Sequence, residues 1–205
     1  MDVINALLLI GPTGSGKSPL GSELEKRGLW GKRVLHFDFG ENLRKGAQGL
    51  LPLKDEERSL IKIILKEARL LKPEEFYLAK VLLHSFLMVN KFTKEDLLLL
   101  NGLPRNIYQA SALQSFIRVT KLIRLDIDYQ TLKIRILIDP AGDRSYRDDD
   151  DEDYLKRKLY WFERETLPLI DFYQKAETPC LSITVDSHDT GLSLYYKLVK
   201  TLECT

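Results

Sequence analysis

The sequence predicts an α/β fold with three layers, in which a five-stranded parallel sheet is covered by helices on both faces. Short apolar runs alternate along the chain with longer stretches of helical pattern, as crossover helices between parallel strands require. The first apolar run, residues 7–10, leads into a glycine-rich loop and then a helical stretch at 20–27. The expected strands are residues 6–10, 33–37, 97–100, 122–127 and 181–185.

The glycine-rich loop carries the most specific motif of the chain. Its residues are Gly11, Pro12, Thr13, Gly14, Ser15, Gly16, Lys17 and Ser18, a G-x-x-x-x-G-K-S pattern. Between a strand and a helix, this pattern is the phosphate-binding P-loop, or Walker A motif. The loop amides and the helix N-terminus present partial positive charge to a polyphosphate, and Lys17 adds a full charge. Ser18 offers a hydroxyl to Mg2+.

Composition excludes several classes of protein. The 205 residues fit one domain, and 31 basic against 30 acidic residues give a net charge of +1. This balance argues against nucleic acid or a membrane surface as partner. Two cysteines are too few for a disulfide framework or a zinc cluster and favour a reducing compartment, so we expect a cytoplasmic protein. No apolar run reaches the roughly 20 residues of a membrane span.

Two insertions interrupt the alternation. Residues 41–90 are helical in pattern, with helices expected at 55–71 and 73–87. Residues 138–153 form either a lid or a solvated turn. The acidic run at 148–153 is equally well explained by a lid role or by the start of the amphipathic helix expected at 154–173. Pro168 should kink or break this helix near its end.

The expected topology also predicts where a ligand binds. A closing helix is expected at 192–202 after the last strand. Right-handed crossovers place the carboxyl ends of all strands at one edge of the sheet. The P-loop and residues 38–40 and 101–102 should therefore converge on one cleft, where ligands of such sheets bind.

Several separated segments carry further motifs. Besides the P-loop, they read GENLR at 40–44, NGLPR at 101–105 with Gln109 following, RDDD at 147–150 and TLPLIDFY at 166–173. With these segments, the chain resembles the family of adenylate kinases and related nucleoside-monophosphate kinases. The segments occur in the family's order and extend the resemblance from about residue 7 to residue 202. The division it implies is a core at 1–40, 91–137 and 154–205, an acceptor-binding insert at 41–90 and a short lid without metal ligands at 138–153.

The resemblance implies a reaction and its catalytic residues. The γ-phosphoryl group of ATP, bound with Mg2+, would pass to AMP or another nucleoside monophosphate, and the enzyme would act as a monomer on small nucleotides. Lys17 would follow the transferred group, Arg105 would bridge acceptor and transferred phosphates, and Arg147 would reach in from the lid. Lys158 stands at the position of another family arginine. Arg135 would pack on the donor adenine.

The resemblance also implies an acceptor site. Arg44 would grip the phosphate of the monophosphate, and Gln109 would read the edge of an adenine. The implied acceptor-binding set is Phe39, Gly40, Arg44, Leu71, Gly102, Arg105 and Gln109. Arginine suits these roles because its planar, permanently charged fork binds phosphate in a bidentate way.

The chain departs from the family at four positions. Asn101 replaces an aspartate that helps to hold hydrated Mg2+; an amide can still accept from a metal-bound water, and Asp38 is a candidate for the missing charge. Lys158 replaces a bidentate arginine, and Asp139 falls where a lid arginine is expected, which Arg144 could replace. Phe39 stands where a small residue approaches the acceptor base, so it could alter base choice.

These departures leave two alternative functions open. The first is a catalytically weakened nucleotide-binding module of the same fold, in which Asn101→Asp should raise activity. The second is a P-loop ATPase that drives a partner protein, although the sequence offers no strong water-activating carboxylate or partner surface for it.

Overall fold

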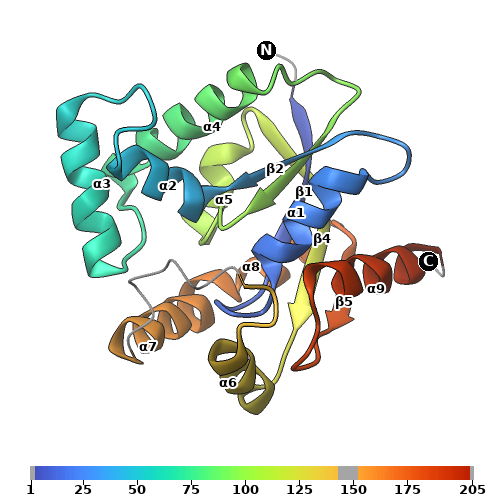
Figure 1. The fold of residues 1–205 in the computed structure, drawn as a ribbon. Coiled ribbons are helices and arrows are strands. Elements are labelled where there is room, and N and C mark those ends of the chain that lie inside the picture. Colours follow the sequence, from blue (N-terminus) through green and yellow to red (C-terminus); the bar gives the residue numbers. More distant parts are fainter. Residues whose placement is uncertain (1–2, 143–151, 204–205) are drawn as a thin grey trace.

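The computed structural model describes residues 3–142 and 152–203 and contains the expected five-stranded parallel sheet (Figure 1). The strand order is β2-β3-β1-β4-β5, so β1 lies in the centre. The strands are β1 Ile4–Ile10, β2 Val34–Asp38, β3 Leu97–Asn101, β4 Ile117–Asp126 and β5 Cys180–Thr184. All five expected strands are thereby confirmed, with shifted ends.

The largest shift is at β4, which begins at Ile117 and not at residue 122. In the first four residues of β4, buried Ile117 and Val119 alternate with exposed Arg118 and Thr120. The prediction followed the continuous apolar run only and overlooked this alternation, which is typical of a half-exposed strand.

Helices cover both faces of the sheet. They are α1 Lys17–Arg27, α2 Phe39–Ala47, α3 Asp55–Glu67, the short 3-10 helix η1 Pro73–Glu75, α4 Tyr77–Val89, α5 Ile107–Leu113, α6 Tyr129–Ile138, α7 Glu152–Trp161, the π-helical segment η2 Phe162–Thr166, α8 Leu169–Lys175 and α9 Gly191–Glu203. Figure 1 shows α1 and α9 together on one side of the sheet.

The core consists of two buried clusters separated by the sheet, because successive side chains of a strand point to opposite faces. Leu7 and Leu9 of β1 pack with Leu20 and Leu24 of α1 and with α9. Ala6, Leu8 and Ile10 of β1 belong to the other cluster, to which α2 to α5 and α8 contribute. The three-layer α/β architecture is therefore confirmed.

Two helix predictions need correction. The helix expected at 154–173 is divided into α7, η2 and α8. The break expected at Pro168 is confirmed, because α8 starts directly after this residue, which lacks an amide hydrogen to continue a helix. The change to a π-helical segment at η2 was not expected. The helix expected at 73–87 is divided into η1 and α4. Within residues 3–142 and 152–203, no helix combines the length and apolar character that a membrane crossing needs.

The central strand should dominate stability. Leu8 of β1 is 1% exposed, whereas Leu137 of α6 is 84% exposed. We expect Leu8→Ala to lower the free energy of unfolding by about 2–5 kcal/mol, because it removes transfer energy and leaves a cavity. Leu137→Ala, the matched control, should stay within about 0.5 kcal/mol of wild type in equilibrium urea unfolding. Equal losses for the two variants would contradict the assignment of β1 to the core.

Candidate functional site

The loop after β1 is shaped by its glycines. Gly14 and Gly16 have φ angles of 85° and 94°, a left-handed conformation that residues with a Cβ rarely adopt. A Cβ at Gly16 would also lie 2.7 Å from a methyl carbon of Leu194 and 3.0 Å from Nη2 of Arg135. The loop therefore sits closely on α9 and α6, and it ends at the N-terminus of α1, whose first residue is Lys17.

The side chain of Lys17 folds back over this loop. Its Nζ donates to the carbonyl oxygens of Gly11 at 2.6 Å and Pro12 at 2.7 Å. Thr13, Gly14, Gly16, Lys17 and Ser18 line the cleft at the carboxyl edge of the sheet. The ammonium group is thus held at the mouth of the loop, beside the backbone that a polyphosphate would approach.

A buried polar cluster lies next to the loop, where β2 and β3 end. Asp38 and Asn101 are register partners on these strands and are 8% and 3% exposed. The Ser18 hydroxyl donates to Oδ2 of Asp38 at 2.5 Å, and the Asn101 amide donates to the same oxygen at 2.8 Å. His36 lies behind them, with Nε2 3.3 Å from Asn101 Nδ2.

Asp38 is ionised in this cluster. Burial alone would raise the pKa of its carboxyl group, but the Ser18 hydroxyl and the Glu41 amide both donate to the carboxylate, and the net effect lowers the pKa. By accepting from the Glu41 amide, Asp38 also acts as the N-cap of α2. Burial lowers the pKa of His36 and so favours its neutral form. The cluster therefore presents one negative charge to the cleft.

Basic side chains line the same cleft. They are Lys17, Arg44, Arg69, Arg105, Arg135 and Lys158. Among the described lining residues, the acidic ones are Asp38 and Asp139. This excess of positive charge suits an anionic ligand with several phosphates.

The structure brings most of the expected acceptor residues to this cleft. Phe39, Gly40, Arg44, Gly102 and Arg105 all line it. Phe39 is 4% exposed, and a Cβ added to Gly102 would lie 3.8 Å from the Cβ of Phe39. The Cβ of Phe39 thus lies near Gly102, where the resemblance places the acceptor base, whereas the residue belongs to the buried core cluster and its ring centroid is 6.2 Å from that of Phe37.

Leu71 and Gln109 are not among the described residues that line the cleft. Both side chains are buried, at 5% and 1% exposure. Oε1 of Gln109 accepts from the main-chain amide of Arg105 at 2.8 Å, so this side chain fixes the backbone next to a cleft residue. Their expected contacts with an acceptor base stay predictions.

Arg69 is a cleft residue that the sequence analysis missed. It lies just beyond α3, and its guanidinium makes a bidentate pair with Glu75, with Nη1–Oε2 at 2.6 Å and Nη2–Oε1 at 2.8 Å. The sequence offered one signal for it: Arg69 lies two residues before Leu71, which belongs to the implied acceptor-binding set. The pair links the ends of α3 and η1 at one wall of the cleft.

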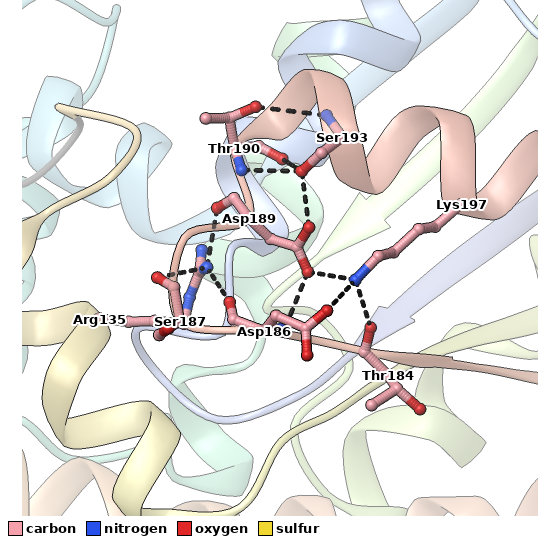
Figure 2. A network of polar contacts seen from close by, with 8 residues as sticks. All are labelled: Arg135, Thr184, Asp186, Ser187, Asp189, Thr190, Ser193 and Lys197. Atoms are coloured by element: carbon pink, nitrogen blue, oxygen red, sulfur yellow. Dashed lines mark hydrogen bonds and ion pairs between the residues drawn. The ribbon is translucent and has the colours of Figure 1, made fainter.

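Arg135, expected to pack on a donor base, connects three segments of the structure. The residue is 2% exposed. Its Nη1 donates to the carbonyl oxygens of Asp186 and Asp189, both at 2.7 Å, and its Nε donates to the carbonyl of Gly14 at 3.1 Å. Figure 2 shows the guanidinium against the loop between β5 and α9. Arg135 thereby ties that loop to the P-loop.

The loop between β5 and α9 is braced a second time by charged side chains (Figure 2). Lys197 of α9 contacts carboxylate oxygens of Asp186 and Asp189, each at 2.6 Å. Ser193 donates to the other carboxylate oxygen of Asp189 at 2.7 Å. The pKa of Asp189 is lowered overall: burial alone would raise this pKa, but the hydrogen bonds from Lys197 and the other donors outweigh the effect of burial. The Arg135 contact is thus made to a stiffened loop.

The remaining expected residues divide into three groups. Lys158 of α7 lines the cleft, and so does Asp139, which ends α6 in a left-handed conformation. Gly11, Pro12 and Ser15 form the interior of the loop: a Cβ at Gly11 would lie 2.7 Å from Ser15 Oγ. Arg144, Arg147 and most of the acidic run lie outside the described residues, so their expected lid roles stay predictions.

The residues present fit a Mg2+ ion that binds together with a nucleotide. Among the described residues, no group of three or more His, Cys, Asp or Glu side chains could hold a metal ion. Mg2+ commonly keeps several waters and uses one or two protein ligands plus substrate phosphates. The Ser18 hydroxyl, with the Asp38 carboxylate beside it at the mouth of the loop, offers such oxygen donors.

The fold and the loop define a P-loop protein of the α/β class, and comparisons with known proteins refine this. No family model matches the chain. It is 25% identical over 197 residues to an adenylate kinase of Rickettsia africae, covering 83% of this chain and 87% of that protein. It is 29% identical over 177 residues to an adenylate kinase of Prochlorococcus marinus, covering 82% of each.

A third relative is named for different substrates. The chain is 28% identical over 174 residues to UMP-CMP kinase 1 of Oryza sativa, covering 84% of this chain and 64% of that protein. Together with the fold, these similarities support a relationship to the family of adenylate kinases and related nucleoside-monophosphate kinases. The family resemblance found in the sequence is thereby confirmed.

The Arg69–Glu75 pair should make stability depend on pH. Hydrogen bonds from Arg69 lower the pKa of Glu75, against the opposing effect of burial. The pair therefore stabilises the fold above the ordinary glutamate pKa of about 4.3, and this stabilisation is lost as the pH falls through the lower folded-state value. We expect Glu75→Gln to cost about 1–3 kcal/mol at neutral pH and progressively less in acid, measured by urea unfolding at several pH values.

Glu74→Gln is the matched control, because Glu74 is the exposed neighbour of Glu75. Its free energy of unfolding should follow that of wild type across the same pH range, within about 0.5 kcal/mol. If both variants gave the same curve, the pair would not be a source of the pH dependence.

Proposed function

We propose that this protein is a nucleoside-monophosphate kinase that transfers the γ-phosphoryl group of ATP to AMP or another nucleoside monophosphate, giving two nucleoside diphosphates. One observation carries the proposal: the P-loop and the arginines from α2 and the segment after β3 line a single cleft. A P-loop that only bound or hydrolysed ATP would not need a second set of phosphate-binding arginines facing it.

The roles follow from what phosphoryl transfer requires. The reaction needs two phosphates held in line and positive charge around the transferred group, with little covalent help from the protein. The P-loop amides and Lys17 would hold the triphosphate, and Arg44 would hold the acceptor phosphate. Arg105 and Lys158 would stabilise the charge on the group in transfer. Mg2+, when bound with the nucleotide, neutralises phosphate charge, and Ser18 is the residue we propose as its direct ligand.

We propose residues 41–90 as the part that holds the acceptor and 138–153 as a lid over the donor. The acceptor base is proposed as adenine, supported by the adenylate kinase relatives. Phe39 lies beside Gly102, where the resemblance expects a small residue, and one relative is named for UMP and CMP. The assay should therefore include pyrimidine acceptors.

The direct test mixes the full-length protein with ATP, Mg2+ and one of AMP, UMP, CMP or GMP, and follows diphosphate formation. We expect transfer with at least one acceptor, fastest with AMP. Binding of ATP without diphosphate formation from any acceptor would contradict the proposal and favour a nucleotide-binding module. ATP hydrolysis without an acceptor, at a rate equal to that with one, would favour an ATPase.

Arg105→Ala should lower kcat by at least about 100-fold, because the variant loses the positive charge that would stabilise the transferred phosphate. The backbone there should keep its course, since Gln109 binds the amide of Arg105 and Thr166 donates to its carbonyl at 2.9 Å. Arg118→Ala on β4 is the control, because that side chain is exposed and is not among the residues that line the cleft. The same coupled assay measures both variants, and equal rates would remove Arg105 from the proposed machinery.

A further inference from the structure

We propose that Asp38, at the end of β2, supplies the carboxylate that holds hydrated Mg2+ beside Ser18. P-loop enzymes commonly bind this ion through the loop hydroxyl and an aspartate on a neighbouring strand. Here the neighbouring strand β3 ends in the uncharged Asn101. The inference rests on the proposed function only in assuming that a metal–nucleotide complex enters the cleft.

The first support is the position of the carboxylate. Oδ2 of Asp38 lies 2.5 Å from Ser18 Oγ, so a metal ion bound to the hydroxyl would have this carboxylate in its immediate surroundings. Ser18 and Asp38 both line the main cleft, and both also line an adjoining hollow between the starts of α1 and α2. Water molecules of a hydrated ion therefore have room on both sides of the pair.

The second support is the orientation of Asn101. The amide nitrogen of Asn101 donates to Oδ2 of Asp38 at 2.8 Å. That nitrogen also lies 3.2 Å from Ser18 Oγ. Asn101 thus turns its donor toward the pair and holds the carboxylate in place.

The third support is the way the two carboxylate oxygens are used. Asp38 is 8% exposed, and its Oδ1 accepts from the Glu41 amide as the N-cap of α2. Its Oδ2 accepts from Ser18 and Asn101. Oδ2 is therefore the oxygen in contact with the P-loop hydroxyl, and it takes no part in capping the helix.

The test measures metal binding directly. Mn2+ would be titrated into the full-length protein saturated with a non-hydrolysable β,γ-imido analogue of ATP, and free Mn2+ followed by electron paramagnetic resonance. We expect Asp38→Asn to weaken Mn2+ binding at least about tenfold, the size typical of losing an outer-shell ligand. The exchange variant Asp38→Asn with Asn101→Asp should bind Mn2+ more tightly than Asp38→Asn alone.

Asp128→Asn is the matched control, because Asp128 caps α6 in the same way, with its Oδ1 accepting from the amides of Gln130 and Thr131. It should bind Mn2+ as wild type does. Circular dichroism and the unfolding midpoint would verify that each variant folds.

Two outcomes would overturn the proposal. In the first, Asp38→Asn binds Mn2+ as tightly as wild type. In the second, the exchange variant binds Mn2+ no more tightly than Asp38→Asn. A wild type that binds Mn2+ through Asp38 but transfers no phosphoryl group would leave this inference standing and remove the kinase function. If the wild type transfers the phosphoryl group and Asp38→Asn binds Mn2+ as tightly as wild type, only this inference would be removed.

Discussion

The site depends on the central position of β1, which pairs with β3 on one side and β4 on the other. Because the sheet is parallel, the loop that leaves β1 opens in the middle of the carboxyl edge, between the ends of its neighbours. β2 and β3 then bring Asp38 and Asn101 into register beside this loop. The cleft is thus a consequence of strand order, and every cleft residue is positioned relative to one loop.

The charges around the cleft have two different tasks. Arg44, Arg105 and Lys158 line the cleft, where phosphates would lie. Arg135 is buried and is bound to main-chain carbonyls, so it holds two loops together even before any nucleotide is considered. A buried arginine with its donors satisfied is a rigid support, and the loop that it binds is stiffened further by Lys197.

The departures from the family are connected through contacts. Asn101 lacks the charge that the resemblance assigns to its position, and the register partner of Asn101 carries a carboxylate on the next strand. Phe39, a second departure, starts α2 directly after that carboxylate, and its Cβ lies near Gly102. The departures at Phe39 and Asn101 are therefore both neighbours of Asp38, one along the chain and one across the sheet.

The sequence by itself determined the strand set, the P-loop and most of the cleft residues. Apolar runs and a spaced glycine motif are local signals in the sequence. The parallel sheet then aligns the carboxyl ends of the strands at one edge. It did not determine the ends of β4, the π-helical interruption before Pro168, or the presence of Arg69 in the cleft, because these depend on packing between distant segments. Only the tertiary structure decided how side chains are used. It turned Gln109 toward a backbone amide, buried Arg135 between two loops and set Asp38 against Ser18, since hydrogen-bond partners are chosen by distance in space and not by spacing along the chain.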